Sequence, residues 1–226
     1  MSIYWLPEDL IFPSVQEADE DGVLAIGGDL SPERLLLAYK SGIFPWYNED
    51  EPIVWWAPNP RFVLYTEKLK ISKSMRSIFN KKAFKVTINT SFNEVITNCK
   101  TITRTDQEGT WIDEDMKAAY TQLHKKGWVH SIETWQNDVL VGGLYGVSIG
   151  KCFFGESMFA TVSNASKFAF ISLVQFLQKK GFEMIDCQVH TPHLESLGAE
   201  LISMDIFQEY LLNCGVNKLD TTNFPG

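Results

Sequence analysis

The segment MIDCQVH, residues 184–190, carries side chains that are well suited to acid–base chemistry. If it forms a β-strand, successive side chains point to opposite faces of the sheet. One face is then apolar and the other polar, with Ile185, Cys187 and Val189 on the first and Asp186, Gln188 and His190 on the second. A carboxylate, an amide and an imidazole in a row beside an apolar core indicate a polar site rather than simple packing.

A second carboxylate occurs in the apolar segment FFGESMF, residues 153–159. Strand geometry predicts that Phe154, Glu156 and Met158 share one face of this segment. Fully buried Glu and Asp side chains are rare unless they are paired. Glu156 and Asp186 on neighbouring strands therefore predict a polar pocket at the centre of a sheet. The alternative is an edge strand whose polar face meets solvent.

Several better-known motifs do not fit the chain. GESMF lacks the last glycine of G-x-S-x-G, so Ser157 is a poor candidate for a nucleophile. Cys187 and His190 point to opposite faces of a strand, and no fourth ligand accompanies them and His193. We therefore expect both histidines in loops or at the surface. AIGGDL, residues 25–30, matches neither phosphate-binding glycine pattern.

The elements that position these residues follow from periodicity and cap signals. Strands are predicted at 61–65, 84–89, 129–135, 139–147, 151–159 and 183–189. Helices are predicted at 72–82, 91–100, 113–127 and 164–181, with two shorter helices after the last strand. The three central strands form an antiparallel unit. Because helices do not alternate strictly with strands, this part is an α+β or mixed-sheet domain.

The first sixty residues have a different character. A short helix is predicted after Ser31, with Pro32 at its first position and Gly42 at its end. The segments around it are rich in glycine, tryptophan and proline, and regular helix is excluded there by Pro45, Pro52, Pro58 and Pro60. We predict a small, loop-rich N-terminal domain over residues 1–61 and a second domain over 62–226.

The composition limits the class of protein. A chain of 226 residues with 45% hydrophobic and 21% charged residues is typical of a soluble globular protein. No apolar run reaches the roughly 20 residues that span a bilayer, and MSIYWLPEDL lacks the pattern of a signal peptide. The cysteines are far apart, at Cys99, Cys152, Cys187 and Cys214. They are expected to be reduced thiols in a cytoplasm.

The net charge of −8 argues against nucleic acid, but the basic residues are unevenly distributed. Seven of the 20 lie between Glu67 and Lys85 and form what we call the basic cluster: Lys68, Lys70, Lys73, Arg76, Lys81, Lys82 and Lys85. Screening confines their influence to roughly 8 Å, so a basic patch on an acidic body can still hold a polyanion. An ordinary solvated helix face explains the pattern equally well.

Four tryptophans lie outside the predicted regular elements: Trp46, Trp55, Trp56 and Trp111. Most tryptophans are core residues. Some could instead stack on bases, each worth about 1–3 kcal/mol. With the basic cluster, they make single-stranded nucleic acid a candidate ligand.

Seven motifs together carry a resemblance to a known family: GGDLSPERLLLAYKSGIFPW, WWAPNPR, EGTWI, VGGLYGV, FFGESMF, NASK and IDCQV. In this order they strongly resemble the leucyl/phenylalanyl-tRNA–protein transferases. The resemblance implies a small N-terminal domain followed by an acyl-CoA N-acyltransferase-like domain with a mixed, mainly antiparallel sheet. It also implies a cytoplasmic aminoacyltransferase of the N-end rule. Such an enzyme moves Leu or Phe, and less readily Met, from aminoacyl-tRNA to the α-amine of proteins that begin with Arg or Lys. An aminoacyl ester is already activated, so no cofactor, ATP or metal is implied.

The resemblance also assigns site residues. Asp186 and Gln188 would act on the attacking amine, and Glu156 would face the acceptor's positive charge. The aminoacyl pocket would contain Leu144, Phe153, Leu173 and Ile185. The 3′-terminal adenosine of the tRNA would lie on Trp46 and Trp111, and the basic cluster would contact tRNA phosphates.

Three other functions remain open at this point. The chain could be an acyl-CoA-dependent N-acetyltransferase of the same fold, although the glycine-rich pyrophosphate loop is absent. It could bind tRNA ends or protein termini without catalysis. It could also transfer an amino acid to an amine of a peptidoglycan precursor.

Overall fold

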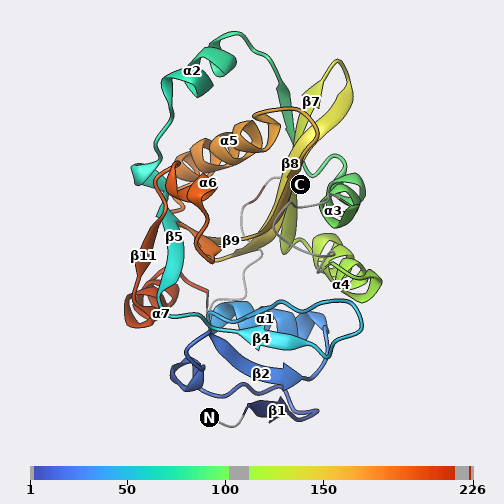
Figure 1. Ribbon diagram of the computed structural model, residues 1–226, viewed down its shortest axis with the longest axis vertical. Coiled ribbons are helices and arrows are strands. Elements are labelled where there is room, and N and C mark those ends of the chain that lie inside the picture. The colour runs from blue at the N-terminus through green and yellow to red at the C-terminus, as the bar shows by residue number, and fades with distance from the viewer. Residues whose placement is uncertain (1–2, 102–111, 217–223, 225–226) are drawn as a thin grey trace.

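The computed structural model describes residues 3–101, 112–216 and 224 (Figure 1). Within these residues the chain forms two β-sheets, one of four strands near the N-terminus and one of seven strands. In Figure 1 the smaller sheet lies below the larger one, with a helix between them. Among the residues described, none of the helices has the length and apolar character needed to cross a membrane.

The N-terminal segment contains more regular structure than its sequence indicates. Its sheet has the order β1-β2-β4-β3, with β1 Tyr4–Leu6, β2 Val23–Gly27, β4 Val54–Trp56 and β3 Phe44–Pro45. The short 3₁₀ helix η1 (Val15–Glu17) and helix α1 (Pro32–Lys40) complete it. The helix is confirmed, and the Ser31 side chain accepts a hydrogen bond from the backbone of Arg34. The strands were missed because segments of two to five residues are too short to show a period.

The seven-stranded sheet is mixed and mainly antiparallel, as predicted. Its order is β11-β5-β10-β9-β8-β7-β6. The strands are β5 Arg61–Tyr65, β6 Lys85–Ile88, β7 Val129–Gln136, β8 Val139–Ile149, β9 Cys152–Ala160, β10 Met184–Gln188 and β11 Glu200–Ile202. Only the pairing of β9 with β10 is parallel in this sheet. The one strand that sequence did not predict is the three-residue edge strand β11.

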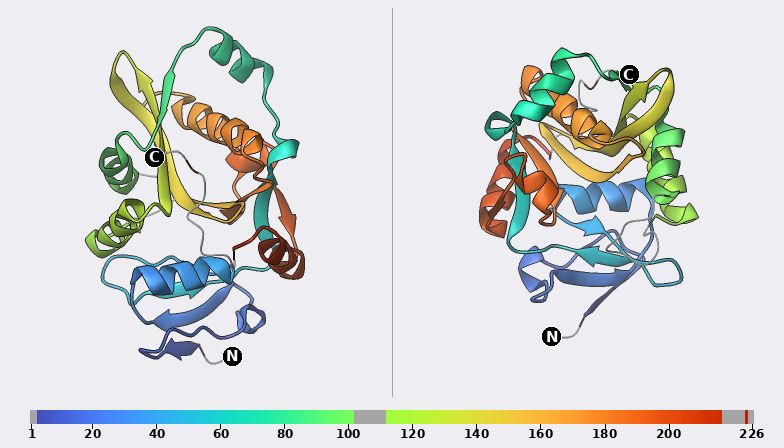
Figure 2. Two further views of the ribbon diagram at one scale, coloured as in Figure 1. Left: turned by 180° about the vertical axis from the view of Figure 1, so that it is seen from behind. Right: turned by 45° about the horizontal axis from the view of Figure 1, so that its top comes forward.

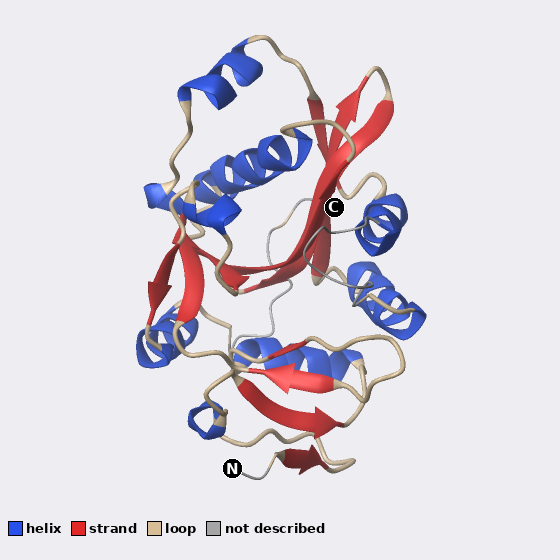
Figure 3. Ribbon diagram, in the orientation of Figure 1, coloured by secondary structure: helices blue, strands red, loops and turns tan. Residues whose placement is uncertain are grey.

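Helices cover both faces of this sheet (Figures 2 and 3). They are η2 Thr66–Lys68, α2 Lys73–Asn80, α3 Phe92–Thr101, α4 Glu114–Lys125, α5 Ala165–Lys179, α6 Pro192–Glu195 and α7 Met204–Asn213. Helix α5 lies across one face, while α3 and α4 lie on the opposite face (Figure 1). Every helix predicted from sequence after residue 62 is present, with ends that differ by a few residues.

The sheet separates two hydrophobic cores. One core joins the N-terminal sheet and α1 to the α3–α4 face and includes Tyr39 and Phe154. The other lies beneath α5 and includes Phe153 and Leu173. We call them the α4-side core and the α5-side core. Because Phe153 and Phe154 are consecutive, their side chains enter opposite cores.

Candidate active site

The site forms where β9 and β10 separate. These two strands pair in parallel over three positions, from Met184 opposite Cys152 to Asp186 opposite Phe154. Beyond these positions, each strand departs from regular geometry. Where two neighbouring strands separate, one cavity can reach both faces of the sheet. A continuous ladder of hydrogen bonds between the strands would close this opening.

A β-bulge in β9 sets the direction of Glu156. Tyr145 of β8 pairs with Ser157 and Gly146 pairs with Gly155, so Glu156 is the extra residue between them. The bulge also corrects the expectation that Phe154, Glu156 and Met158 share a face. Phe154 belongs to the α4-side core, whereas Met158 packs against the α5-side core. One extra residue reverses the alternation of side chains in the rest of the strand.

The end of β10 has a comparable irregularity. The pairing of β10 with β5 shifts between Asp186 and Gln188, and Gln188 has a φ of 65°. This left-handed conformation is uncommon for a residue other than glycine and ends the strand. His190, just beyond, is exposed, and its Nε2 lies 3.1 Å from Glu195, as expected for a surface residue. His193 instead lies on α6, partly buried, and lines the cavity described next.

A cavity of about 400 Å³ occupies the opening between the strands. Its lining includes all seven residues that the family resemblance assigned to catalysis or to the aminoacyl pocket: Leu144, Phe153, Glu156, Leu173, Ile185, Asp186 and Gln188. The four apolar members belong to the α5-side core. The polar members have partners on the opposite side of the sheet, so the cavity is apolar at one end and polar at the other.

Glu156 is the centre of a hydrogen-bond network. Its Oε1 accepts from the Tyr39 hydroxyl at 2.7 Å and from Gln188 Nε2 at 2.9 Å. Its Oε2 accepts from the Tyr120 hydroxyl at 2.9 Å, and the two tyrosine hydroxyls also contact each other. Burial raises the pKa of Glu156 to about 8, although the three donors oppose that shift and the charge of Asp186 adds to it.

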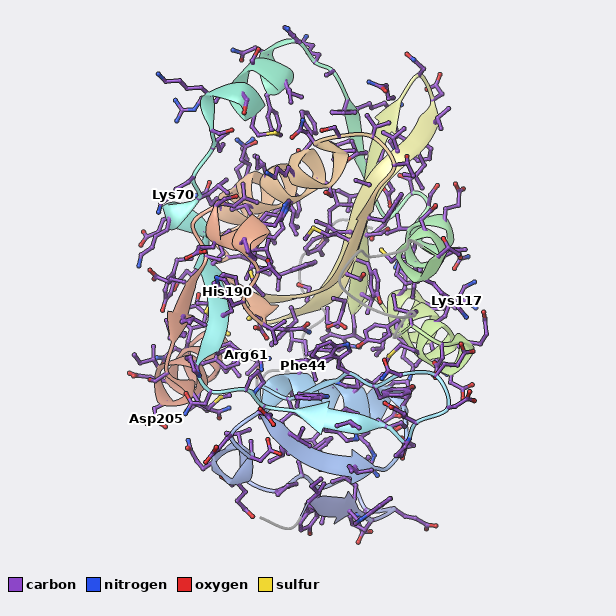
Figure 4. All side chains as sticks on the ribbon, in the orientation of Figure 1. Phe44, Arg61, Lys70, Lys117, His190 and Asp205 are labelled. Carbon is purple, nitrogen blue, oxygen red and sulfur yellow. The ribbon has the colours of Figure 1, made fainter. Side chains whose placement is uncertain are left out.

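Asp186 is held by Arg61. Arg61 Nε donates to Oδ1 at 2.8 Å and its Nη2 donates to Oδ2 at 2.6 Å, and both side chains are fully buried. Oδ1 also accepts from the backbone N–H of Gln188 at 2.9 Å. The guanidinium lies over the rings of Phe44 and Phe207, and Figure 4 shows Arg61 and Phe44 where the N-terminal sheet meets the larger one. Asp186 therefore fixes the backbone of Gln188, whose side chain in turn reaches Glu156.

Three residues of this network were not predicted as site residues. Tyr120 appears in the sequence only as an apolar position of a helix, and Tyr39 lies in the helix after Ser31. Arg61 begins an apolar strand and has no acidic neighbour in the sequence. The only available signal for Arg61 was an arginine in a segment that otherwise enters the core, since such residues are rarely buried unless paired.

The tryptophans divide into different environments. Trp55 is fully buried and its Nε1 donates to the Gly27 carbonyl, so it is a core residue. Trp46 is partly buried, and its ring lies 5.3 Å from that of Trp56. Trp111 lies outside the described residues.

All seven members of the basic cluster are exposed. They lie along η2, α2 and the start of β6, and Lys70 is labelled in Figure 4 at the outer side of this region. Lys68 forms an ion pair with Glu200. Helix α2 packs on the α5-side core through Met75 and through Phe79, whose ring stacks on Phe168 of α5 at 3.9 Å.

Comparisons with known proteins identify the family. A family model described as leucyl/phenylalanyl-tRNA protein transferase matches residues 63–212, and a model of that family's N-terminal domain matches residues 28–59. A leucyl/phenylalanyl-tRNA–protein transferase of Flavobacterium johnsoniae is 61% identical over 92% of this chain and 99% of its own length. One from Syntrophus aciditrophicus is 56% identical over 92% of this chain and 87% of its own length.

Solved structures show only a distant likeness. L-PGS from Bacillus licheniformis has a TM-score of 0.42 at 11% identity, covering 73% of this chain and 55% of its own. A GCN5-related N-acetyltransferase from Kribbella flavida has a TM-score of 0.38 at 9% identity, covering 76% and 61%.

The α+β fold and the matches over most of the chain define an enzyme of the aminoacyltransferase class. More particularly, the chain belongs to the leucyl/phenylalanyl-tRNA–protein transferase family.

Proposed function

We propose that the chain transfers Leu or Phe, and less readily Met, from aminoacyl-tRNA to the α-amino group of proteins that begin with Arg or Lys. The new N-terminal residue is then a degradation signal of the N-end rule, and the reaction takes place in the cytoplasm. The observation that carries the proposal is the cavity between β9 and β10. Its apolar end suits the transferred side chain, and its polar end suits an amine.

The reaction joins the amine nitrogen to the aminoacyl carbonyl carbon and breaks the ester bond to the tRNA ribose. The amine loses a proton and the ribose oxygen gains one. Gln188 Nε2 donates to Glu156, which orients the amide so that its Oε1 accepts a hydrogen bond from the amine. Such positioning supplies much of the rate in reactions of this kind.

At the polar end, Glu156 faces the positively charged side chain of the acceptor's N-terminal residue. A pKa of about 8 for Glu156 is close to the ordinary pKa of an α-amine, roughly 7.7–8.0. An Arg or Lys side chain that enters beside Glu156 stabilises the ionised carboxylate and is stabilised by it. Asp186 acts through Gln188, because its oxygens are already occupied by Arg61 and by the Gln188 backbone.

The apolar end selects the transferred residue. Leu144, Phe153, Leu173 and Ile185 line a slot for an aliphatic or aromatic side chain that is unbranched at Cβ. A branch at Cβ, as in Val or Ile, would clash near the ester. Because one methylene is worth only about 1–3 kcal/mol in such a slot, Met is accepted at a lower rate.

The tRNA is held outside the cavity. We assign binding of the 3′-terminal adenosine to Trp46 and Trp111. Of these two residues, Trp111 lies outside the described part of the chain. The exposed basic cluster contacts phosphates of the acceptor stem, which carries no sequence information. We also propose the division into domains at residues 1–61 and 62–226, which the two separate family matches support.

The test is a transfer assay with labelled Phe-tRNA and matched peptides that begin with Lys, Arg or Ala, without ATP, CoA or added metal. Label on the Lys and Arg peptides alone supports the proposal. Equal label on the Ala peptide contradicts the acceptor rule. Tight binding of Phe-tRNA without transfer favours a non-catalytic binding protein, and a requirement for acyl-CoA or activity on peptidoglycan-stem peptides favours the other two alternatives.

A further inference from the structure

Phe224 is a buried aromatic residue near the C-terminus, at 7% exposure, in the α5-side core. Its ring contacts four aromatic side chains, from β7, β9, α5 and the connection between α5 and β10: His130, Phe153, Phe176 and Phe182. The closest contact is with His130, whose ring stacks on Phe224 at 4.0 Å and 15°. The family match ends at residue 212, so Phe224 lies outside the matched segment.

Phe153 contacts both the cavity and Phe224. It lines the cavity, and its ring centroid is 5.9 Å from that of Phe224, with the planes 28° apart. The Phe153 ring also lies over Gly146 of β8, where an added Cβ would come within 2.5 Å of its Cε1. Contact with the sheet therefore blocks the Phe153 ring on the Gly146 side.

The neighbouring strand positions explain why Phe224 and Phe153 lie side by side. His130 of β7 pairs directly with Gly146 of β8. Phe224 covers His130, and Phe153 fills the space that Gly146 leaves open. The ring of Phe224 thus packs against Phe153 from outside the cavity lining.

We propose that Phe224 is a specificity-determining residue that sets the depth of the aminoacyl pocket by holding Phe153 in place. This inference rests on the proposed role of the cavity as the aminoacyl pocket. The wall behind the transferred side chain is formed by two aromatic layers, Phe153 in contact with the substrate and Phe224 behind it. Without the second layer, the pocket lengthens, so that a short side chain packs less tightly and a longer one fits.

The test compares tRNAs charged with Leu, with Phe and with p-methylphenylalanine, whose side chain is one methyl group longer than that of Phe. The measured quantity is kcat/KM for transfer to one Arg-peptide. We expect Phe224→Ala to raise the ratio of p-methylphenylalanine to Leu by about 10-fold or more, in the range typical of one carbon in an apolar slot. Phe224→Leu, which keeps most of the packing, is expected to give a smaller change in the same direction.

Phe84→Ala is the matched control. Phe84 packs against Phe168 of α5, in the same core, but it is not part of the cavity lining. This variant should lose thermal stability without a change in the ratio. A Phe224→Ala enzyme that is folded but keeps the wild-type ratio within about twofold would show that Phe224 is only a packing residue, since one carbon in such a slot is worth more than that.

Leu173→Ala separates failure of this inference from failure of the proposed pocket. Leu173 lines the cavity directly, so its truncation changes the ratio if the cavity is the aminoacyl pocket. A shift with Leu173→Ala but not with Phe224→Ala overturns the inference alone. If neither variant changes the ratio, the cavity is not the aminoacyl pocket, and the inference about Phe224 fails with that assignment.

Discussion

Arg61 and Asp186 form a bidentate ion pair between β5 and β10, with both side chains fully shielded from solvent. Removing two charges from water is costly, and good geometry with further hydrogen bonds offsets part of that cost. Here the further bond is the donation from the Gln188 backbone to Asp186. The pair therefore links Arg61, at the start of β5, to the backbone conformation of Gln188, whose side chain reaches Glu156.

Replacing Arg61 with methionine should destabilise the fold by about 3–5 kcal/mol, because Asp186 would remain as an unpaired buried charge. Urea unfolding measures this directly. The double variant Arg61→Met/Asp186→Leu removes both charges and should recover most of the stability, yet transfer should stay low because Gln188 is no longer fixed. A single Arg61→Met variant as stable as the wild type would mean that the buried pair contributes little.

Gln188→Ala should lower kcat by about 100-fold, the scale expected when a reacting group is displaced by roughly 1 Å. The variant loses the 2.9 Å hydrogen bond from Nε2 to Glu156 and the proposed hydrogen bond with the amine. Steady-state kinetics with Phe-tRNA and an Arg-peptide provide the measurement. His190→Ala, two residues away and exposed, is the control and should retain wild-type kcat. Equal losses in both variants would point to a general disturbance of the loop.

The ionisation of Glu156 should make stability depend on pH. Its folded pKa of about 8 lies above the ordinary value of 4.5, so its stabilising contribution is complete below pH 4.5. The contribution is lost progressively as the pH rises from 4.5 to about 8, because over this range the unfolded state has released the proton while the folded state still holds it. Glu156→Gln stays neutral throughout and lacks this dependence.

The measurement is the urea midpoint of both proteins from about pH 5 to about pH 9, a window that brackets the folded pKa. The wild type should lose stability relative to Glu156→Gln as the pH rises. A difference between the two proteins that stays constant with pH would show that Glu156 has an ordinary pKa in the folded protein. Tyr39 and Tyr120 should stay protonated over this pH range, because burial raises the pKa of both well above the ordinary value.

The basic cluster should contribute to tRNA binding in a salt-dependent way. Lys81→Ala/Lys82→Ala should raise KM for aminoacyl-tRNA and leave kcat unchanged, because these exposed lysines touch only phosphates in the proposed complex. The slope of log KM against log salt should decrease by about 0.7–0.9 for each phosphate that is no longer neutralised by a lysine. Lys125→Ala, an exposed lysine on α4, is the control, and an equal effect there would indicate unspecific attraction.

Much of the fold could be predicted because its signals are local. Strands and helices after residue 62 follow from runs of apolar residues, their spacing and their caps, all within about ten residues of chain. The same local alternation identified Asp186 and Gln188 as polar members of an apolar strand. Local alternation could not show the irregularities that orient the site side chains. The β-bulge at Glu156 is defined by the pairing of its neighbours Gly155 and Ser157 with Gly146 and Tyr145 of β8.

The sequence by itself determined which residue types were available, in which elements they lie, and that two carboxylates enter an apolar sheet. The tertiary structure decided their partners. Arg61 meets Asp186 across 125 residues, Tyr39 meets Glu156 across 117, and Phe224 packs behind Phe153 from the far end of the chain. Periodicity carries no information over such separations, because these contacts depend on the order of strands in the sheet and on the faces that bulges expose.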